Sequence, residues 1–123
     1  MNLVAEQNAF LIDFAKLINY IDNTDDGMLI TGGELWRTPE QEKIYFDSGK
    51  SKTMNSNHLR RLAVDLNFIK NGIVIYDKET LQRYGDYWEG LNPANRWGGN
   101  FPKWFPGSTS GFTDCPHFER TAI

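Results

Sequence analysis

The chain of 123 residues contains only two histidines, and each stands close to a carboxylate in the sequence. His58 precedes Asp65 by seven residues, and His117 follows Asp114 by three. Two histidines and one carboxylate form a ligand set for catalytic Zn²⁺, with the fourth position open to water. Taken singly, a lone histidine is more often an incidental surface or core residue, and a strand aspartate more often faces solvent. Taken together, His58, Asp65 and His117 are candidate zinc ligands.

The spacing of His58 and Asp65 restricts how both could bind one ion. Seven extended residues span roughly 23 Å, and seven helical residues rise about 10 Å. Two ligands of one zinc ion lie within about 4 Å of each other. The chain must therefore fold back between the two residues, and the segment LRR at 59–61 would have to supply the bend.

The segment DCPH offers a third ligand and a general base. Pro116 forces Cys115 into an extended or turn conformation, so the segment cannot be the middle of a helix. A tight turn would bring Asp114 close to whatever His117 binds, where it could take a proton from the attacking water. Glu119 is the rival base, because it shares the face of His117 if the segment is a strand.

Three helices are predicted around these residues. The first covers 6–21, with one buried face marked by apolar residues at intervals of three and four: Phe10, Leu11, Phe14, Leu17, Ile18 and Ile21. The second is shorter, with Thr38 as N-cap, Pro39 at the first helical position and Gly49 as its stop. Helical spacing recurs over 78–92, although Gly85 weakens that pattern.

Strands are predicted at 27–36, 62–69 and 73–77, the last two joined by the hairpin signal Asn71-Gly72. Gly, Pro and Trp dominate from 92 to 111, which indicates an ordered loop pinned by aromatic residues. These elements predict an α+β fold, a small antiparallel sheet with helices packed around it. The length fits a single domain over 1–123.

Composition narrows the function classes. A charged fraction of 24%, a hydrophobic fraction of 40% and an aromatic fraction of 14% predict a folded globular protein. The net charge is −3, whereas nucleic-acid-binding domains usually carry an excess of positive charge, so nucleic acid is not an expected partner. A single cysteine, Cys115, allows no internal disulfide and no CxxC zinc site. The N-terminal segment lacks a basic region and an uninterrupted apolar run, so we expect no signal peptide, no membrane span and synthesis in the cytosol.

Four ordered segments together resemble the M15 family of zinc peptidoglycan peptidases. SNHLRRLAVD is similar to the first metal motif, S-x-H-x-x-G-x-A-x-D, and DCPH to the second, an acidic residue, two spacers and His. WRTPEQ resembles the segment Y-R-[ST]-x-x-x-Q, and RWGGNF the W-G-G-x-[WF] segment of the endolysin branch. The resemblance covers residues from about 30 to 119.

Two residues depart from these motifs. Arg61 stands where the family usually has Gly, so we expect a tight or left-handed turn there to be made differently. Trp36 replaces the Tyr that precedes Arg37, which keeps an aromatic ring.

The resemblance implies a hedgehog and D-Ala-D-Ala-peptidase-like fold with a zinc cleft at the sheet. It implies that His58, Asp65 and His117 hold Zn²⁺ and that Asp114 is the general base. Arg37 would stabilise the oxyanion or hold a substrate carboxylate; a surface salt bridge is its ordinary alternative.

Further residues are candidates for substrate binding. Gln41 belongs to the segment that resembles the family's, and Ser56 could hydrogen-bond substrate or form a turn. Trp97 could form a wall of the cleft or pin the loop to the core. Cys115 could ligate zinc through its thiolate, but it has no matching family role and is treated as a free thiol.

The implied reaction is hydrolysis of an amide bond in the peptide stem of bacterial peptidoglycan. L-alanyl-D-glutamate endopeptidase fits the motifs best, and D-alanyl-D-alanine carboxypeptidase is second. A catalytically inert wall-binding or zinc-binding domain is a different class, against which the presence of Asp114 argues. A carbohydrate-binding module has only the four tryptophans in its support. We expect a phage-encoded monomer that reaches the wall through a holin or in a virion.

Overall fold

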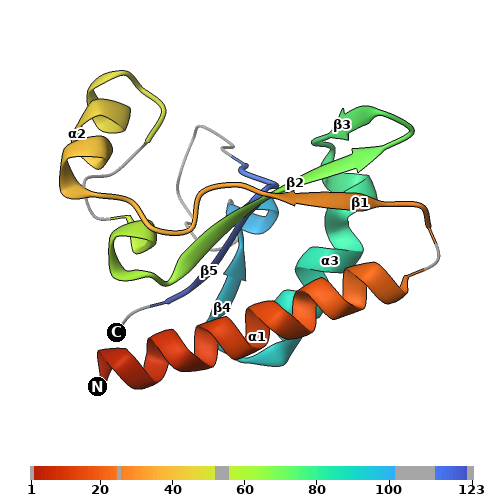
Figure 1. Ribbon diagram of the computed structural model, residues 1–123, viewed down its shortest axis with the longest axis horizontal. Helices are drawn as coiled ribbons and strands as arrows, with labels where there is room; N and C mark the ends of the chain where they lie inside the picture. Colours follow the sequence, from red (N-terminus) through yellow and green to blue (C-terminus); the bar gives the residue numbers. More distant parts are fainter. Residues whose placement is uncertain (1, 25, 52–55, 102–112, 122–123) are drawn as a thin grey trace.

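Three α-helices and a five-stranded antiparallel sheet are present in this computed structural model, which describes residues 2–24, 26–51, 56–101 and 113–121 (Figure 1). In chain order the elements are α1 (Leu3–Asn23), β1 (Leu29–Gly32), α2 (Pro39–Asp47), the 3-10 helix η1 (Asn57–Arg60), β2 (Ala63–Lys70), β3 (Ile73–Ile75), α3 (Lys78–Leu91), β4 (Asn95–Trp97), the 3-10 helix η2 (Gly98–Asn100) and β5 (His117–Arg120). The predicted α+β class is confirmed.

The sheet is built around its longest strand, β2. The strand order is β1-β2-β5-β4, and β3 pairs with β2 as the second strand of a hairpin. Asn71 and Gly72 both have positive φ, 53° and 75°, which confirms the predicted hairpin turn. β5, the last strand in the sequence, lies between β2 and β4 and pairs with both. In this register Asp65 of β2 is the direct partner of His117 of β5.

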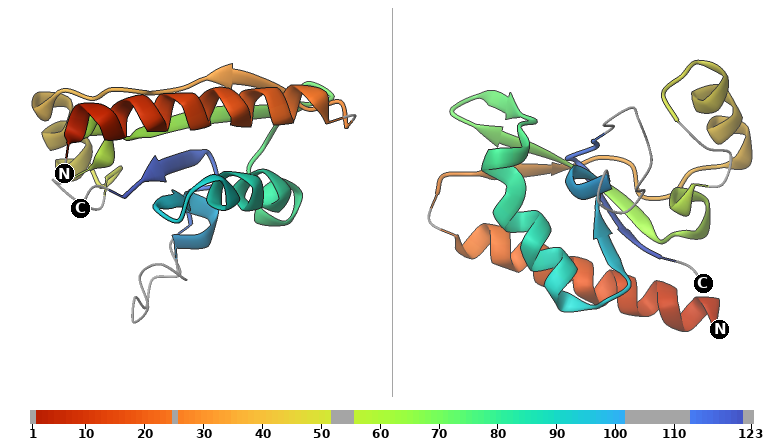
Figure 2. Two further views of the ribbon diagram at one scale, coloured as in Figure 1. Left: turned by 90° about the horizontal axis from the view of Figure 1, so that it is seen from below. Right: turned by 180° about the vertical axis from the view of Figure 1, so that it is seen from behind.

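Alternation along β2 and β5 divides the sheet into two faces. Val64, Leu66 and Phe68 of β2 point to one face with Phe118 of β5, and all four are buried. Helices α1 and α3 cover this face and cross each other, whereas α2 lies apart from them (Figures 1 and 2). The aromatic contacts that join these layers include Phe10 to Trp88, Trp88 to Phe118 and Phe68 to Tyr84. Asp65, His117 and Glu119 therefore occupy the opposite face.

A buried ion-pair network ties α1 to the end of β5. The guanidinium of Arg120 donates to Glu6 at 2.6 Å and to Asp13 at 3.3 Å, and Asn95 of β4 also donates to Asp13, at 3.1 Å. Arg120, Asp13 and Asn95 are all buried. The first turns of α1 consequently lie beside the end of β5, as both views of Figure 2 show.

Predicted and observed elements differ in several places. The strand expected over 27–36 is limited to Leu29–Gly32. Short regular elements, β4 and η2, lie within the stretch expected to be a loop over 92–111, of which the structure describes residues 92–101. Leu11, expected on the buried face of the first helix, is 52% exposed. None of the helices in the described ranges is long and apolar enough to cross a membrane.

Candidate metal centre

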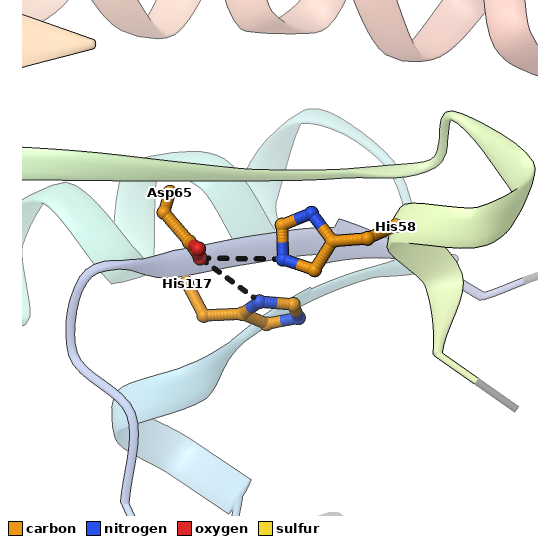
Figure 3. A group of neighbouring side chains, drawn as sticks. All are labelled: His58, Asp65 and His117. Carbon is orange, nitrogen blue, oxygen red and sulfur yellow. Dashed lines mark hydrogen bonds and ion pairs between the residues drawn. The ribbon is translucent and has the colours of Figure 1, made fainter. Parts of the chain in front are cut away.

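The three predicted zinc ligands lie together on the sheet face opposite Val64 and Phe118, each delivered by a different element (Figure 3). Oδ1 of Asp65 lies 3.4 Å from Nε2 of His58 and 3.2 Å from Nδ1 of His117. One ligand atom from each residue lies within 4.8 Å of the others. The solvent-facing alternative for Asp65 does not hold, because its carboxylate is only 27% exposed and points at both histidines. This group could hold one metal ion.

The bend that brings His58 to Asp65 is made by η1 and the residue after it. Arg61 adopts the left-handed conformation, with φ 58° and ψ 36°, and directs the chain back into β2. The predicted bend at 59–61 is thus confirmed. The expectation that a left-handed turn would be made differently without glycine is wrong, because Arg61 takes that conformation itself.

Hydrogen bonds on the outer side of each imidazole fix the nitrogen that faces inward. Nδ1 of His58 lies 3.2 Å from the carbonyl oxygen of Leu35, which can only accept, so the proton is on Nδ1. Nε2 of His117 lies 2.8 Å from Oε1 of Glu119 and donates to it in the same way. In the neutral rings, Nε2 of His58 and Nδ1 of His117 therefore present lone pairs to Asp65. Such a donor set, with oriented outer nitrogens, fits a zinc ion.

The electrostatics of the group also favour a cation. Burial alone would lower the pKa of His117, but hydrogen bonds with Asp65 and Glu119 and their charges outweigh it and raise that pKa to about 10. Burial would raise the pKa of Asp65, but its contacts with His117 and His58 hold it well below the usual value. A proton on Nδ1 of His117 therefore occupies the place that a metal ion would take.

Glu119 is held on the far side of His117, away from the inward nitrogens. One carboxylate oxygen accepts from His117, and the other accepts from Nδ2 of Asn57 at 3.1 Å and from the guanidinium of Arg96. The residue is buried, and the charges of His117 and Arg96 outweigh that burial and lower its pKa. Both oxygens are occupied, which favours a role in orienting His117 over the alternative role as base. The strand spacing of two residues was the only signal of this contact in the sequence.

Asp114 lies at the turn that leads into β5. Its backbone carbonyl accepts from the N–H of His117 at 3.0 Å, and its own N–H donates to the carbonyl of Gly98 at 2.9 Å. Burial raises the pKa of its carboxyl group; the charge of His117 opposes this shift, and that of Asp65 adds to it. The charges of the ligand group therefore shift the pKa of this carboxyl group, although Asp114 is not one of the converging residues. Its role as base stays a prediction.

Gly98 allows this turn to pack closely. A Cβ atom at position 98 would lie 2.0 Å from the carbonyl oxygen of Asp114 and 3.0 Å from Cβ of His117. Such contacts force one of the two segments to move, and neither neighbour is the end of a flexible side chain.

We expect the substitution Gly98→Ala to weaken binding of added Zn²⁺ by at least about tenfold, because it displaces both a candidate ligand and the turn before it. Chelator competition on the purified variant measures this. Gly90→Ala is the matched control, since a Cβ atom there meets no neighbour within 4 Å. Equal zinc affinity in Gly98→Ala and the wild type would contradict the close packing of this turn.

Arg37 lies beside η1 and is held by two carboxylates. Its guanidinium donates to Glu34 and, at 2.5 Å, to Glu42, and it also lies 3.4 Å from Oγ of Ser56. Burial would lower the pKa of Arg37, but these two carboxylates raise it further above its usual value. The surface salt bridge expected as its alternative does not describe this pair, because the Glu42 side chain is fully buried.

The predicted substrate contacts differ in their exposure. Ser56 is buried and caps η1, its Oγ accepting from the N–H of His58 at 3.2 Å, which is the turn-forming alternative. Gln41 is half-buried in the first turn of α2. Trp97 has no exposed surface: its indole donates to the carbonyl of Cys115 at 2.8 Å and covers Gly85 of α3, which favours the core alternative over the cleft wall. Burial raises the pKa of the Cys115 thiol, and Cys115 is outside the converging ligand group.

A solved structure with a similar fold is that of the L-Ala D-Glu endopeptidase ChiX from Serratia marcescens. The two structures have a TM-score of 0.56 and 23% sequence identity, over 75% of this chain and 66% of that chain. This chain thus spans slightly less than two thirds of the length of that protein. At this identity the likeness shows a shared fold. No family model matches this sequence, and no curated protein sequence does.

Proposed function

We propose that this protein is a zinc-dependent peptidase that hydrolyses an amide bond in the peptide stem of bacterial peptidoglycan. The observation that carries the proposal is the convergence of His58, Asp65 and His117, one ligand atom of each lying within 4.8 Å of the others, with both imidazoles oriented by outer hydrogen bonds. The likeness in fold to an L-Ala D-Glu endopeptidase supports the substrate class and favours cleavage between L-alanine and D-glutamate. Membership of the M15 family, predicted from the four segments, is part of this proposal.

The chain's own residues divide the work around the ligand group. When bound, Zn²⁺ would polarise the scissile carbonyl and make water more acidic. Asp114 would accept the proton from the attacking water, a task suited to a carboxyl group whose pKa is raised. Arg37 would orient the substrate or stabilise the developing oxyanion, in competition with the charges of Glu34 and Glu42.

Two measurements on one preparation test the proposal: the zinc content and mass spectrometry of peptidoglycan fragments after digestion. We expect one zinc ion per chain and new L-alanine and D-glutamate termini. His58→Ala should lose both properties, whereas Asn67→Ala, on the same strand two residues from Asp65, should keep them. Zinc without released peptides would instead identify an inert zinc-binding domain, and new D-alanine termini a carboxypeptidase.

Metal removal should also lower the stability of the fold, because the three ligands come from η1, β2 and β5. Zinc at 100 times its dissociation constant would stabilise the native state by about 2.7 kcal/mol. The measurement is thermal unfolding with and without a chelator. An unchanged melting temperature in zinc-loaded and zinc-free protein would contradict metal binding by the folded state.

A further inference from the structure

The two residues that depart from the metal-peptidase motifs contact each other. The guanidinium carbon of Arg61 lies 4.6 Å from the centre of the Trp36 ring, which places the cation over its face. Trp36 belongs to the segment between β1 and α2, and Arg61 follows η1. The contact therefore joins two segments that are 25 residues apart in the sequence.

These two segments are the ones that hold His58. The carbonyl of Leu35 accepts from Nδ1 of the His58 ring, as described above. The carbonyl of His58 accepts from the N–H of Arg37 at 3.3 Å and from the N–H of Arg61 at 3.4 Å. Trp36 thus lies between two residues that bond to His58, and its ring partner Arg61 is a third. The stack therefore joins the two segments, residues 35–37 and Arg61, whose hydrogen bonds hold His58.

The conformation of Arg61 needs such support. A residue with a Cβ atom is disfavoured at φ 58°, where glycine would be unstrained. The end of η1 is also held from α1, where Nε2 of Gln7 donates to the carbonyl of Arg60 at 2.7 Å. Trp36 and Arg61 also line a partly open apolar pocket of about 160 Å³, together with Gln7, Phe10, Leu11 and Leu35. The turn is therefore held by side-chain contacts from α1 on one side and from Trp36 on the other.

We propose that Trp36 and Arg61 are a positioning pair that fixes the η1 turn, and through it the direction of Nε2 of His58. The inference deepens the proposed zinc function, on which its effect on metal affinity rests. The pair replaces the freedom of a glycine turn by a side-chain contact. Neither side chain touches the ligand atoms, so both act through the backbone of the turn.

A double-mutant cycle tests the pair. Trp36→Leu removes the ring face, and Arg61→Gln removes the cation while keeping a side chain in the left-handed position. We expect each change to weaken zinc affinity by about two- to fivefold, the size of a cation–π contact at an exposed site. The double variant should be no weaker than the weaker single variant, because both remove one shared contact. Arg61→Lys should recover part of the loss.

Amide hydrogen exchange in the zinc-free protein is a second measurement of the effect of the pair on the turn, and it does not require bound metal. The N–H groups of Arg37 and of residue 61 should exchange faster in both single variants, because their bonds to the His58 carbonyl open more often. Arg83→Gln is the matched control: its guanidinium lies 5.6 Å from the Tyr84 ring on α3, and its loss should change neither measurement.

The outcomes separate the pair from the proposed function. A wild-type protein that binds no zinc overturns the proposed function, while the exchange rates still decide whether the pair holds the turn. Fully additive losses in the cycle, or exchange rates equal to those of the wild type, overturn the positioning pair. An Arg61→Lys variant no better than Arg61→Gln contradicts the cation–π contact as its basis.

Discussion

Substitution of Asp114 by asparagine is expected to reduce hydrolysis of stem peptides by about 10²- to 10⁴-fold, the contribution of a positioned general base. Asparagine keeps the size of the side chain and cannot take up a proton. The backbone of residue 114 keeps its bonds to Gly98 and His117, so the turn into β5 should survive the change. Zinc affinity should therefore stay close to that of the wild type.

The two readouts must be taken on the same variant. Rates come from release of peptide fragments under single-turnover conditions, and affinities from chelator competition. Asp86→Asn, an exposed carboxylate on α3 that accepts from Gln82, is the control for loss of one negative charge. Wild-type rates in Asp114→Asn would remove this residue from the mechanism and leave Glu119 as the remaining candidate.

Substitution of Glu119 by glutamine is expected to weaken zinc binding by about 10- to 100-fold, as is typical when the hydrogen-bond partner of a ligating histidine is changed. A neutral amide oxygen is a weaker acceptor for Nε2–H of His117, so the inward Nδ1 becomes less basic. The change also removes the negative charge that faces the guanidinium of Arg96 and the amide of Asn57. Because Asn57 precedes His58, both candidate histidine ligands lose part of their support.

Chelator competition measures this loss of affinity, and peptide release under zinc saturation measures the rate separately. With zinc in excess, Glu119→Gln should hydrolyse stem peptides at a rate near that of the wild type. Asp26→Asn is the control, since Asp26 accepts from Tyr84 and Arg83 instead of a histidine. If Glu119→Gln binds zinc normally but is inactive, the assignments of Glu119 and Asp114 are reversed.

Local patterns were enough to predict the helices, the hairpin and the bend before β2. Thr38 caps α2 through the N–H of Gln41, as its position before Pro39 indicated. The turn at Asn71-Gly72 requires positive φ at two successive residues, a conformation that few dipeptides other than Asn-Gly adopt readily. The ligand spacing required a reversal at 59–61, and the structure has it there. These features depend on residues that are close in the sequence, and short segments are therefore enough to predict them.

Features that depend on distant segments were not predictable. β4 has three residues, too few to show alternation, and it forms because β5 supplies its partner. The complete burial of the Trp97 side chain depends on Gly85, twelve residues earlier, because the absence of a Cβ atom there leaves room for the indole. The partner of the His58 ring is a backbone carbonyl, that of Leu35, and a carbonyl has no signature in the sequence. Residue types thus predicted which three side chains converge, whereas the groups that orient them required the fold.

The place of β5 in the sheet also determines when the three converging side chains can come together as the chain is synthesised. Its two neighbours, β2 and β4, both precede it in the chain, and it carries His117 into register with Asp65. A nascent chain that has emerged only as far as β4 holds two of the three ligands and lacks the strand between β2 and β4. The ligand group is therefore completed only after β5 has been synthesised, by a contact between residues 52 positions apart. Metal uptake should accordingly require that β5 has been inserted between β2 and β4.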